Sequence, residues 1–274
     1  MDTAYATIAL VIANVLFSYN AFKDKHYHND NIFNIDRILV GKEYKRMITS
    51  GFLHANVWHL GFNMIALHSF GSALEFWLGS VNFLIIYFAS LIGGSLLSLY
   101  MHRNHGEYSA LGASGAVFGV VYATIVLHPS SEVSLFMVLP IVAWAYGLLF
   151  IVISIYGIRT QEGDIGHDAH LGGALIGMLT LLIMRPHLCQ EHFITIAVLV
   201  LPALFFIFMI VRNPAFITID SVLGKGKGFT TVEDRYNSDK AKSQQEIDRI
   251  LDKIAKKGMN SLTNRERDIL KNKG

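Results

Sequence analysis

Residues 110–119 read ALGASGAVFG, and the interpretation of the whole chain starts from this stretch. Small residues stand on both sides of one hydroxyl, Ser114, and an apolar run continues to Leu127. Such small-residue runs are ordinary in membrane helices, where they let helix backbones pack closely. At about 1.5 Å per residue the run barely crosses an apolar core of about 30 Å, which is tolerated in a helix surrounded by other helices. The stretch predicts a buried membrane helix and leaves open whether Ser114 is a nucleophile or a packing residue.

Six longer apolar runs flank this helix and predict further membrane spans. They lie near residues 4–22, 58–79, 82–101, 134–157, 168–185 and 193–212. Of the 274 residues, 52% are apolar and only 16% are charged, whereas a soluble domain carries about 25% charge. We therefore expect an all-α polytopic membrane protein, a helical bundle of seven spans. The first run lacks a basic n-region and a small-residue cleavage site, so we expect a retained span and not a signal peptide.

The sequence predicts a membrane body at residues 1–212 and a polar tail. The body contains a long first loop, residues 23–57, whose mixed apolar and charged content predicts a folded, partly membrane-embedded insert. Residues 213–245 include GKGKG and are expected to form a flexible linker. Residues 246–274 carry apolar residues at helical spacing and a T-x-x-E capping box, which predict a small helical hairpin. The tail is either a weakly ordered appendage or a docking element for an unknown partner or the membrane surface.

Polar residues gather at one end of three separate spans. The second, fourth and sixth spans cross the membrane in the same direction, so their N-terminal ends lie on one face. These ends carry His54, His59, Asn63, Ser114, His167 and His170. Polar and ionisable groups inside a membrane are costly and usually face the bundle interior or a water-filled cavity. Their clustering at similar depth predicts a functional site at this face.

Ser114 and His170 suit acyl-transfer chemistry. A serine hydroxyl becomes a good nucleophile when a base such as histidine lies within hydrogen-bond reach. Ser114 would begin a helix, where its backbone N–H is unpaired and available to a developing oxyanion. His59 and Asn63 are four residues apart, share a helix face and would add side-chain donors. Asp168 stands two residues before His170, on roughly the opposite side of a helix, so a catalytic triad lacks its acid.

These residues also have simpler explanations. A lone serine in GASG is more often a close-packing residue, and a lone interior histidine is more often structural than a base. Two glycine pairs at i, i+4 spacing predict helix packing contacts: Gly115 with Gly119, and Gly173 with Gly177. His54 and His59 lack the spacing of a helical zinc pair and no H-E-x-x-H occurs, so we predict no metal and no cofactor. A net charge of +2 gives no reason to expect a nucleic-acid partner.

Four blocks resemble the rhomboid family of intramembrane serine proteases, in the family's order and over roughly residues 4–185. RMITSGFLHANVWHLGFN is similar to the family's R-x-x-T and H-x4-H-x3-N motifs, which correspond to Arg46, Thr49, His54, His59 and Asn63. ALEFWLGS resembles the E-x-x-x-G-S end of the second span, with Glu75, Gly79 and Ser80. GASG is similar to the family's serine motif, and AHLGGALIG is similar to its A-H-x-x-G-x-x-x-G motif.

The resemblance implies a Ser–His dyad without an acid, with Ser114 as the nucleophile and His170 as the general base and acid. The oxyanion would be held by the Ser114 backbone amide, His59 and Asn63. Phe118 stands where the family often has a tyrosine that stacks on the catalytic histidine, and phenylalanine can still stack. The further supporting residues are Gly112, His54, Gly173, Gly177, Arg46 and Glu75. Lys45 stands where many members have tryptophan, and residues 193–212 add a seventh span to the six-span core, a known family variant.

We therefore predict a serine endopeptidase that cleaves the transmembrane segments of membrane-anchored proteins, with single-span proteins and the lipid bilayer as its partners. The alternatives are a catalytically silent rhomboid-like protein that binds membrane clients, and a transporter or channel. The expected location is a prokaryotic inner membrane, with the active site on the extracytoplasmic side. Six Lys/Arg in the first loop and 13 in the tail would then lie outside the cytoplasm, in conflict with the positive-inside rule.

Overall fold

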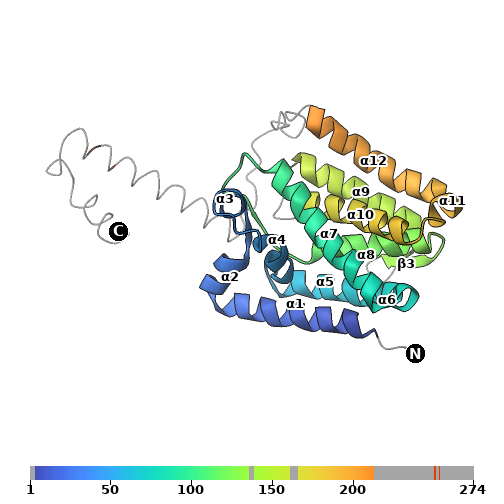
Figure 1. Ribbon diagram of the computed structural model, residues 1–274, viewed down its shortest axis with the longest axis horizontal. Coiled ribbons are helices and arrows are strands. Elements are labelled where there is room, and N and C mark those ends of the chain that lie inside the picture. Colours follow the sequence, from blue (N-terminus) through green and yellow to red (C-terminus); the bar gives the residue numbers. More distant parts are fainter. Residues whose placement is uncertain (1–3, 136–138, 161–165, 213–249, 251–252, 254–274) are drawn as a thin grey trace. The chain divides into compact units, whose positions relative to one another are not determined.

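The computed structural model describes residues 4–135, 139–160 and 166–212, together with residues 250 and 253. The predicted linker at residues 213–245 lies outside the described residues, as does the predicted hairpin at 246–274 apart from those two positions. Five helices are long and apolar enough to cross a membrane (Figure 1): α1 (Tyr5–Lys23), α7 (Ser80–Met101), α9 (Ala143–Thr160), α10 (His167–Met184) and α12 (Phe193–Arg212). The shorter apolar helix α8 (Ser114–Leu127) begins at the residue that the sequence predicts.

A further helical run covers residues 57–78, where the second span is predicted. It consists of α5 (Val57–Ala66), a π-helical turn η2 (Leu67–Gly71) and α6 (Ser72–Leu78). Gly79 follows α6 with φ at 79°, a left-handed conformation that glycine adopts at little steric cost. Because α7 begins at the next residue, Gly79 alone joins α6 to α7.

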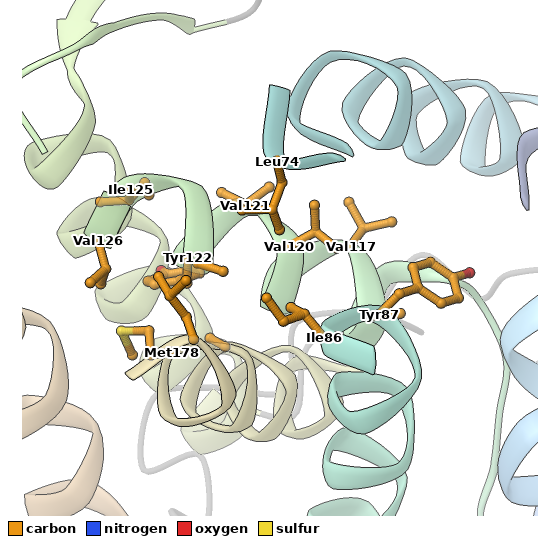
Figure 2. Close-up of a cluster of buried hydrophobic side chains, with 14 of the residues drawn as sticks. Leu74, Ile86, Tyr87, Val117, Val120, Val121, Tyr122, Ile125, Val126 and Met178 are labelled. Atoms are coloured by element: carbon orange, nitrogen blue, oxygen red, sulfur yellow. The ribbon is translucent and has the colours of Figure 1, made fainter. Parts of the chain in front are cut away.

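Helix α8 is enclosed by its neighbours. Ten of its 14 residues are buried, and Figure 2 shows Leu74 of α6, Ile86 of α7 and Met178 of α10 packed around it. A helix that is apolar all round is stable where it is buried. By contrast, α1, α9 and α12 leave many large apolar side chains exposed, as expected of helices that face lipid. The shortness of α8 is thus compatible with its interior position.

The predicted span at residues 134–157 is wrong at its N-terminal end. Strand β3 (Glu132–Leu135) pairs antiparallel with β4 (Leu139–Val142), and helix α9 begins only at Ala143. Pro140 has no N–H for a helical hydrogen bond, and the β-branched residues Ile141 and Val142 favour extended backbone. A hydropathy window averages over these residues and does not separate a short apolar strand from a helix.

The first loop is built from short elements around its own small core. These are α2 (Lys25–Asn31), β1 (Phe33–Asn34), α3 (Ile35–Leu39), α4 (Arg46–Thr49) and the 3-10 turn η1 (Ser50–Phe52). Its core contains Phe33, Ile35, Ile38 and Met47. Strand β1 pairs antiparallel with β2 (Ser109–Ala110), which lies just before Ser114. The first loop is therefore attached to the segment that leads into α8. On the other side of the bundle, the short helix α11 (Leu188–Glu191) lies between α10 and α12.

Candidate active site

A tight turn precedes Ser114 at the start of α8. Gly112 has φ at 127° and donates its N–H to the carbonyl of Ser50 at 3.0 Å. A Cβ added to Gly112 would lie 2.9 Å from Cε1 of His59 and 3.6 Å from Oγ of Ser114. Both the backbone conformation and the available space therefore favour glycine at this position. The ring of His59 and the hydroxyl of Ser114 therefore both lie close to Gly112.

His170 lies in the first turn of α10 and is buried. Its ring stacks on Phe118 of α8, with ring centroids 4.2 Å apart and an interplanar angle of 7°. This is the contact that the family resemblance implies for Phe118. The stack occupies the face of the imidazole and leaves the ring nitrogens, which lie on its edge, for hydrogen bonding.

Glycines allow α8 and α10 to approach at backbone distance. A Cβ on Gly173 would lie 1.9 Å from the carbonyl oxygen of Gly115, and a Cβ on Gly177 would lie 2.3 Å from that of Gly119. No side chain fits at either position without moving one helix. The glycine pairs of the two helices therefore face each other, and the contact holds the start of α8 against the start of α10.

Ser114 and His170 lie on adjoining helices, but no hydrogen bond joins their side chains in the part of the chain that the structure describes. The starts of these two helices are held together by the glycine contact and by the stack of Phe118 on His170. Catalytic hydrogen bonds are often long or poorly aligned without substrate and tighten in the complex. In the described residues the starts of α8 and α10 thus lie against each other without a hydrogen bond between the Ser114 and His170 side chains.

The two side chains predicted to help bind an oxyanion differ in their surroundings. Nδ1 of His59 accepts the backbone N–H of Ala55 at 3.4 Å, which leaves Nε2 as the nitrogen that carries a proton. This Nε2 lies close to Gly112, since a Cβ added to Gly112 would be 3.1 Å from it. Asn63 is buried, and its Nδ2 donates to the carbonyl of His59 at 2.9 Å. Asn63 therefore binds its own helix with one amide hydrogen and retains the second as a donor.

His54 links α1 to the turn before Ser114. In the described residues it makes no hydrogen bond with the hydroxyl of Ser114. Its Nε2 accepts the N–H of Ala113 at 3.4 Å, so Nδ1 carries the proton and donates to Oγ of Ser18 at 2.9 Å. Its ring also meets that of His59 edge-on, with centroids 5.0 Å apart. His54 is thus placed to position the turn. The sequence reasoning missed Ser18, whose only signal is a hydroxyl on an apolar helix.

Arg46 holds the first loop together from a buried position. Its Nη1 donates to the carbonyls of Asn29 and Ile32 at 2.7 and 2.9 Å, and its Nε pairs with Glu43 at 2.7 Å. The hydrogen bond from Arg46 keeps the pKa of Glu43 below its usual range. The planar guanidinium suits three acceptors at once, which explains why arginine and not lysine stands here.

Glu75 caps the start of α1. Its carboxylate accepts the backbone N–H groups of Ala6 and Thr7 at 2.9 and 2.8 Å, and the hydroxyls of Thr7 and Ser80 at 2.7 and 2.6 Å. These amides belong to the first turn of α1, where no intrahelical acceptor exists and negative charge is favourable. Glu75 therefore fixes the second span against the first.

A small cavity lies beside Ser114. It has a volume of about 30 Å³, and hydroxyl-bearing residues Ser50, Ser95 and Ser98 contribute to its wall. Most of the wall is apolar, but a cavity of this size with several hydroxyl groups in its wall is large enough for a water molecule. Within the described residues, no group of three or more His, Cys, Asp or Glu is arranged to hold a metal ion.

These features define a polytopic helical membrane protein that carries a serine and a histidine on adjoining helix starts. The family model for the rhomboid domain matches residues 41–187, more than half of the chain. The chain therefore belongs to the rhomboid family. Residues 230–273 of the tail match a family of unknown function (DUF6576).

Three curated relatives illustrate the range of the similarity. "Rhomboid protein 1, mitochondrial" of Saccharomyces cerevisiae is 40% identical over 137 residues, which cover 48% of this chain and 40% of the relative. "RHOMBOID-like protein 12, mitochondrial" of Arabidopsis thaliana is 30% identical over 189 residues, which cover 63% of this chain and 56% of the relative. "Rhomboid protease GluP" of Bacillus subtilis is 33% identical over 135 residues, which cover 49% of this chain and 25% of the relative. The chain thus spans about half or less of the length of these relatives.

The family match and the helices confirm the predicted all-α, multi-pass, rhomboid-like bundle. The number of spans, the domain boundaries and the roles of the site residues stay predictions. Two of the three relatives are named as mitochondrial proteins. The comparisons therefore give no support to the expected prokaryotic inner membrane.

Proposed function

We propose that this protein is an intramembrane serine endopeptidase that cleaves the transmembrane segments of membrane-anchored proteins through Ser114 and His170. The observation that carries the proposal is the joining of the two helix starts, by the backbone contact of Gly115 with Gly173 and by the stack of Phe118 on His170. Membership of a family that includes a protein named as a protease adds support.

In the proposed reaction, His170 accepts the proton of the Ser114 hydroxyl as the oxygen attacks the peptide carbonyl, and later donates it to the leaving amine. The developing oxyanion receives hydrogen bonds from the backbone N–H of Ser114 and from His59 and Asn63. A substrate helix must unwind locally first, because its carbonyls are engaged in its own hydrogen bonds. The cavity lined by Ser50 and Ser98 supports access of water to the acyl-enzyme.

The proposal is tested with a single-span model substrate in proteoliposomes. We expect Ser114→Ala and His170→Ala to abolish cleavage while the protein stays folded, and His59→Ala to slow it by about 10²–10³-fold. A fluorophosphonate probe should label the wild type and not Ser114→Ala. Ser130→Ala and His187→Ala, both at exposed positions, are the matched controls. Wild-type cleavage by Ser114→Ala would refute the proposal.

The alternative is a catalytically silent protein that binds membrane clients. It predicts that the wild type neither cleaves the substrate nor is labelled by the probe. It also predicts that Ser114→Ala retains client proteins as well as the wild type does.

Orientation is part of the same proposal, with the active site on the extracytoplasmic side. Cysteine-accessibility labelling at Lys42 and Lys240 tests it, since labelling only from the cytoplasmic side would overturn this orientation. The tail at residues 213–274 is proposed to dock an unknown partner.

A further inference from the structure

Asp168 is a buried carboxylate that the proposed reaction does not use. It lies in the first turn of α10, two residues before His170, and only 4% of its surface is exposed. An acidic residue in a first helical turn usually interacts with the helix dipole while remaining solvated. Taking a carboxylate out of water is costly unless a partner compensates it, and ionisable groups within membrane proteins are rarely incidental.

Asp168 pairs with His102, the residue that follows α7. Nε2 of His102 lies 3.3 Å from Oδ2 of Asp168. The other side of the histidine is occupied by Tyr108, whose ring stacks on it with centroids 3.6 Å apart and an interplanar angle of 5°. Burial raises the pKa of Tyr108, and the negative charge of Asp168 raises it further. The three residues thus form one cluster, defined here as the Asp168–His102–Tyr108 cluster.

The cluster joins α10 to the segment that leads into Ser114. Tyr108 also accepts the N–H of Ile35 through its carbonyl at 3.2 Å and meets the ring of Phe33 edge-on. The next residues pair with the first loop as strand β2, and the turn at Gly112 follows directly. His102 and Tyr108 therefore lie at the beginning and in the middle of the segment that carries Ser114, while Asp168 lies on the helix that carries His170.

We propose that the contact of Asp168 with His102 positions the first turn of α10 against the segment before α8, and thereby sets the alignment of Ser114 and His170. The inference rests on the proposed function. Asp168 acts here as a positioning residue, since it touches neither Ser114 nor substrate. A single polar contact has this effect because the alignment of reacting groups is sensitive to displacements of about 1 Å.

The test compares Asp168→Asn, His102→Phe and the double variant in proteoliposomes. Phenylalanine retains a ring for Tyr108 to stack on and removes both ring nitrogens, including the Nε2 that faces Asp168. We expect each single variant to lower kcat about tenfold with KM within about twofold, because alignment is lost while substrate binding is retained. The double variant should be no slower than the worse single variant, since both changes break one contact. Asp30→Asn and His26→Phe, both at exposed positions on the first loop and away from the cluster, are the matched controls.

Amide hydrogen exchange gives a readout that does not depend on cleavage. Both single variants should exchange faster than the wild type across residues 104–113 and 167–170, and both controls should not. Wild-type kcat in Asp168→Asn, losses that multiply in the double variant, or unchanged exchange would each overturn the inference. Ser114→Ala is run in parallel. Cleavage that persists in Ser114→Ala refutes the proposed function. Cleavage that is lost in Ser114→Ala but unchanged in Asp168→Asn refutes only the positioning role.

Discussion

Replacing Gly173 by alanine should separate α8 from α10 and disable the site. An added Cβ would stand 1.9 Å from the carbonyl oxygen of Gly115, about 1.5 Å short of the 3.4 Å at which ordinary contact begins. The obstacle is backbone, so no side-chain rotation relieves it. Overpacking of this kind costs about 1–3 kcal/mol of folding free energy. Because Gly115 follows Ser114 directly and Gly173 lies one turn after His170, the displacement acts on the proposed dyad itself.

The effect on catalysis is larger than the effect on stability. A misplacement of about 1 Å between reacting groups can cost about 100-fold in rate, so we expect Gly173→Ala to cleave a model substrate about 100 times more slowly at temperatures where it remains folded. Cleavage is measured in proteoliposomes, and the free energy of unfolding by denaturant titration in detergent. Gly61→Ala is the matched control, because an added Cβ on this α5 glycine meets nothing within 4 Å.

In the control, alanine should raise stability by about 0.5–1 kcal/mol through its better helix propensity, with cleavage near that of the wild type. If Gly173→Ala unfolds with the same free energy as the wild type and cleaves at the same rate, the two helices can separate without loss of stability. That result would refute the reasoning from the backbone contact. A stability loss with full cleavage would refute the step from the glycine contact to the dyad.

Three further predictions concern the residues that support the site. Glu75→Gln should lower the thermal unfolding midpoint, because the neutral amide weakens charged hydrogen bonds worth about 1.5–3 kcal/mol each at the start of α1, whereas Glu132→Gln at an exposed position should not. Arg46→Lys should make the first loop more sensitive to chymotrypsin, since an ammonium does not reach all three acceptors; unchanged digestion would contradict this. The stabilising effect of Glu43 is present above its unfolded pKa and lost as pH falls through its lowered folded pKa. Amide hydrogen exchange of the first loop, measured against pH and corrected for the intrinsic exchange rate, should therefore show opening only in that acidic range. Opening that already occurs near neutrality would count against the prediction.

Much of the site could be predicted from the sequence because it depends on local pattern. The start of α8 follows from an apolar run with a small-residue turn before it, and the glycine pairs follow from their i, i+4 spacing. The pairing of Asp168 with His102 could not be predicted, because His102 follows another helix, α7, and no local pattern indicates the contact. The engagement of Asn63 with its own turn also depends on a rotamer, which spacing alone does not specify. The β3–β4 hairpin was missed because hydropathy weighs the apolar character of residues and ignores backbone preference.

The one-residue connection at Gly79 has a consequence for how the protein enters its membrane. With α6 ending at Leu78 and α7 beginning at Ser80, no polar loop separates the second and third spans. A connection of one residue holds the end of α6 directly against the start of α7. We therefore expect the two spans to integrate together, as a helical hairpin. Since Gly79 carries no charge, the connection itself offers no positive residue that would hold it on the cytoplasmic side, and the orientation of this hairpin is set by residues elsewhere in the chain.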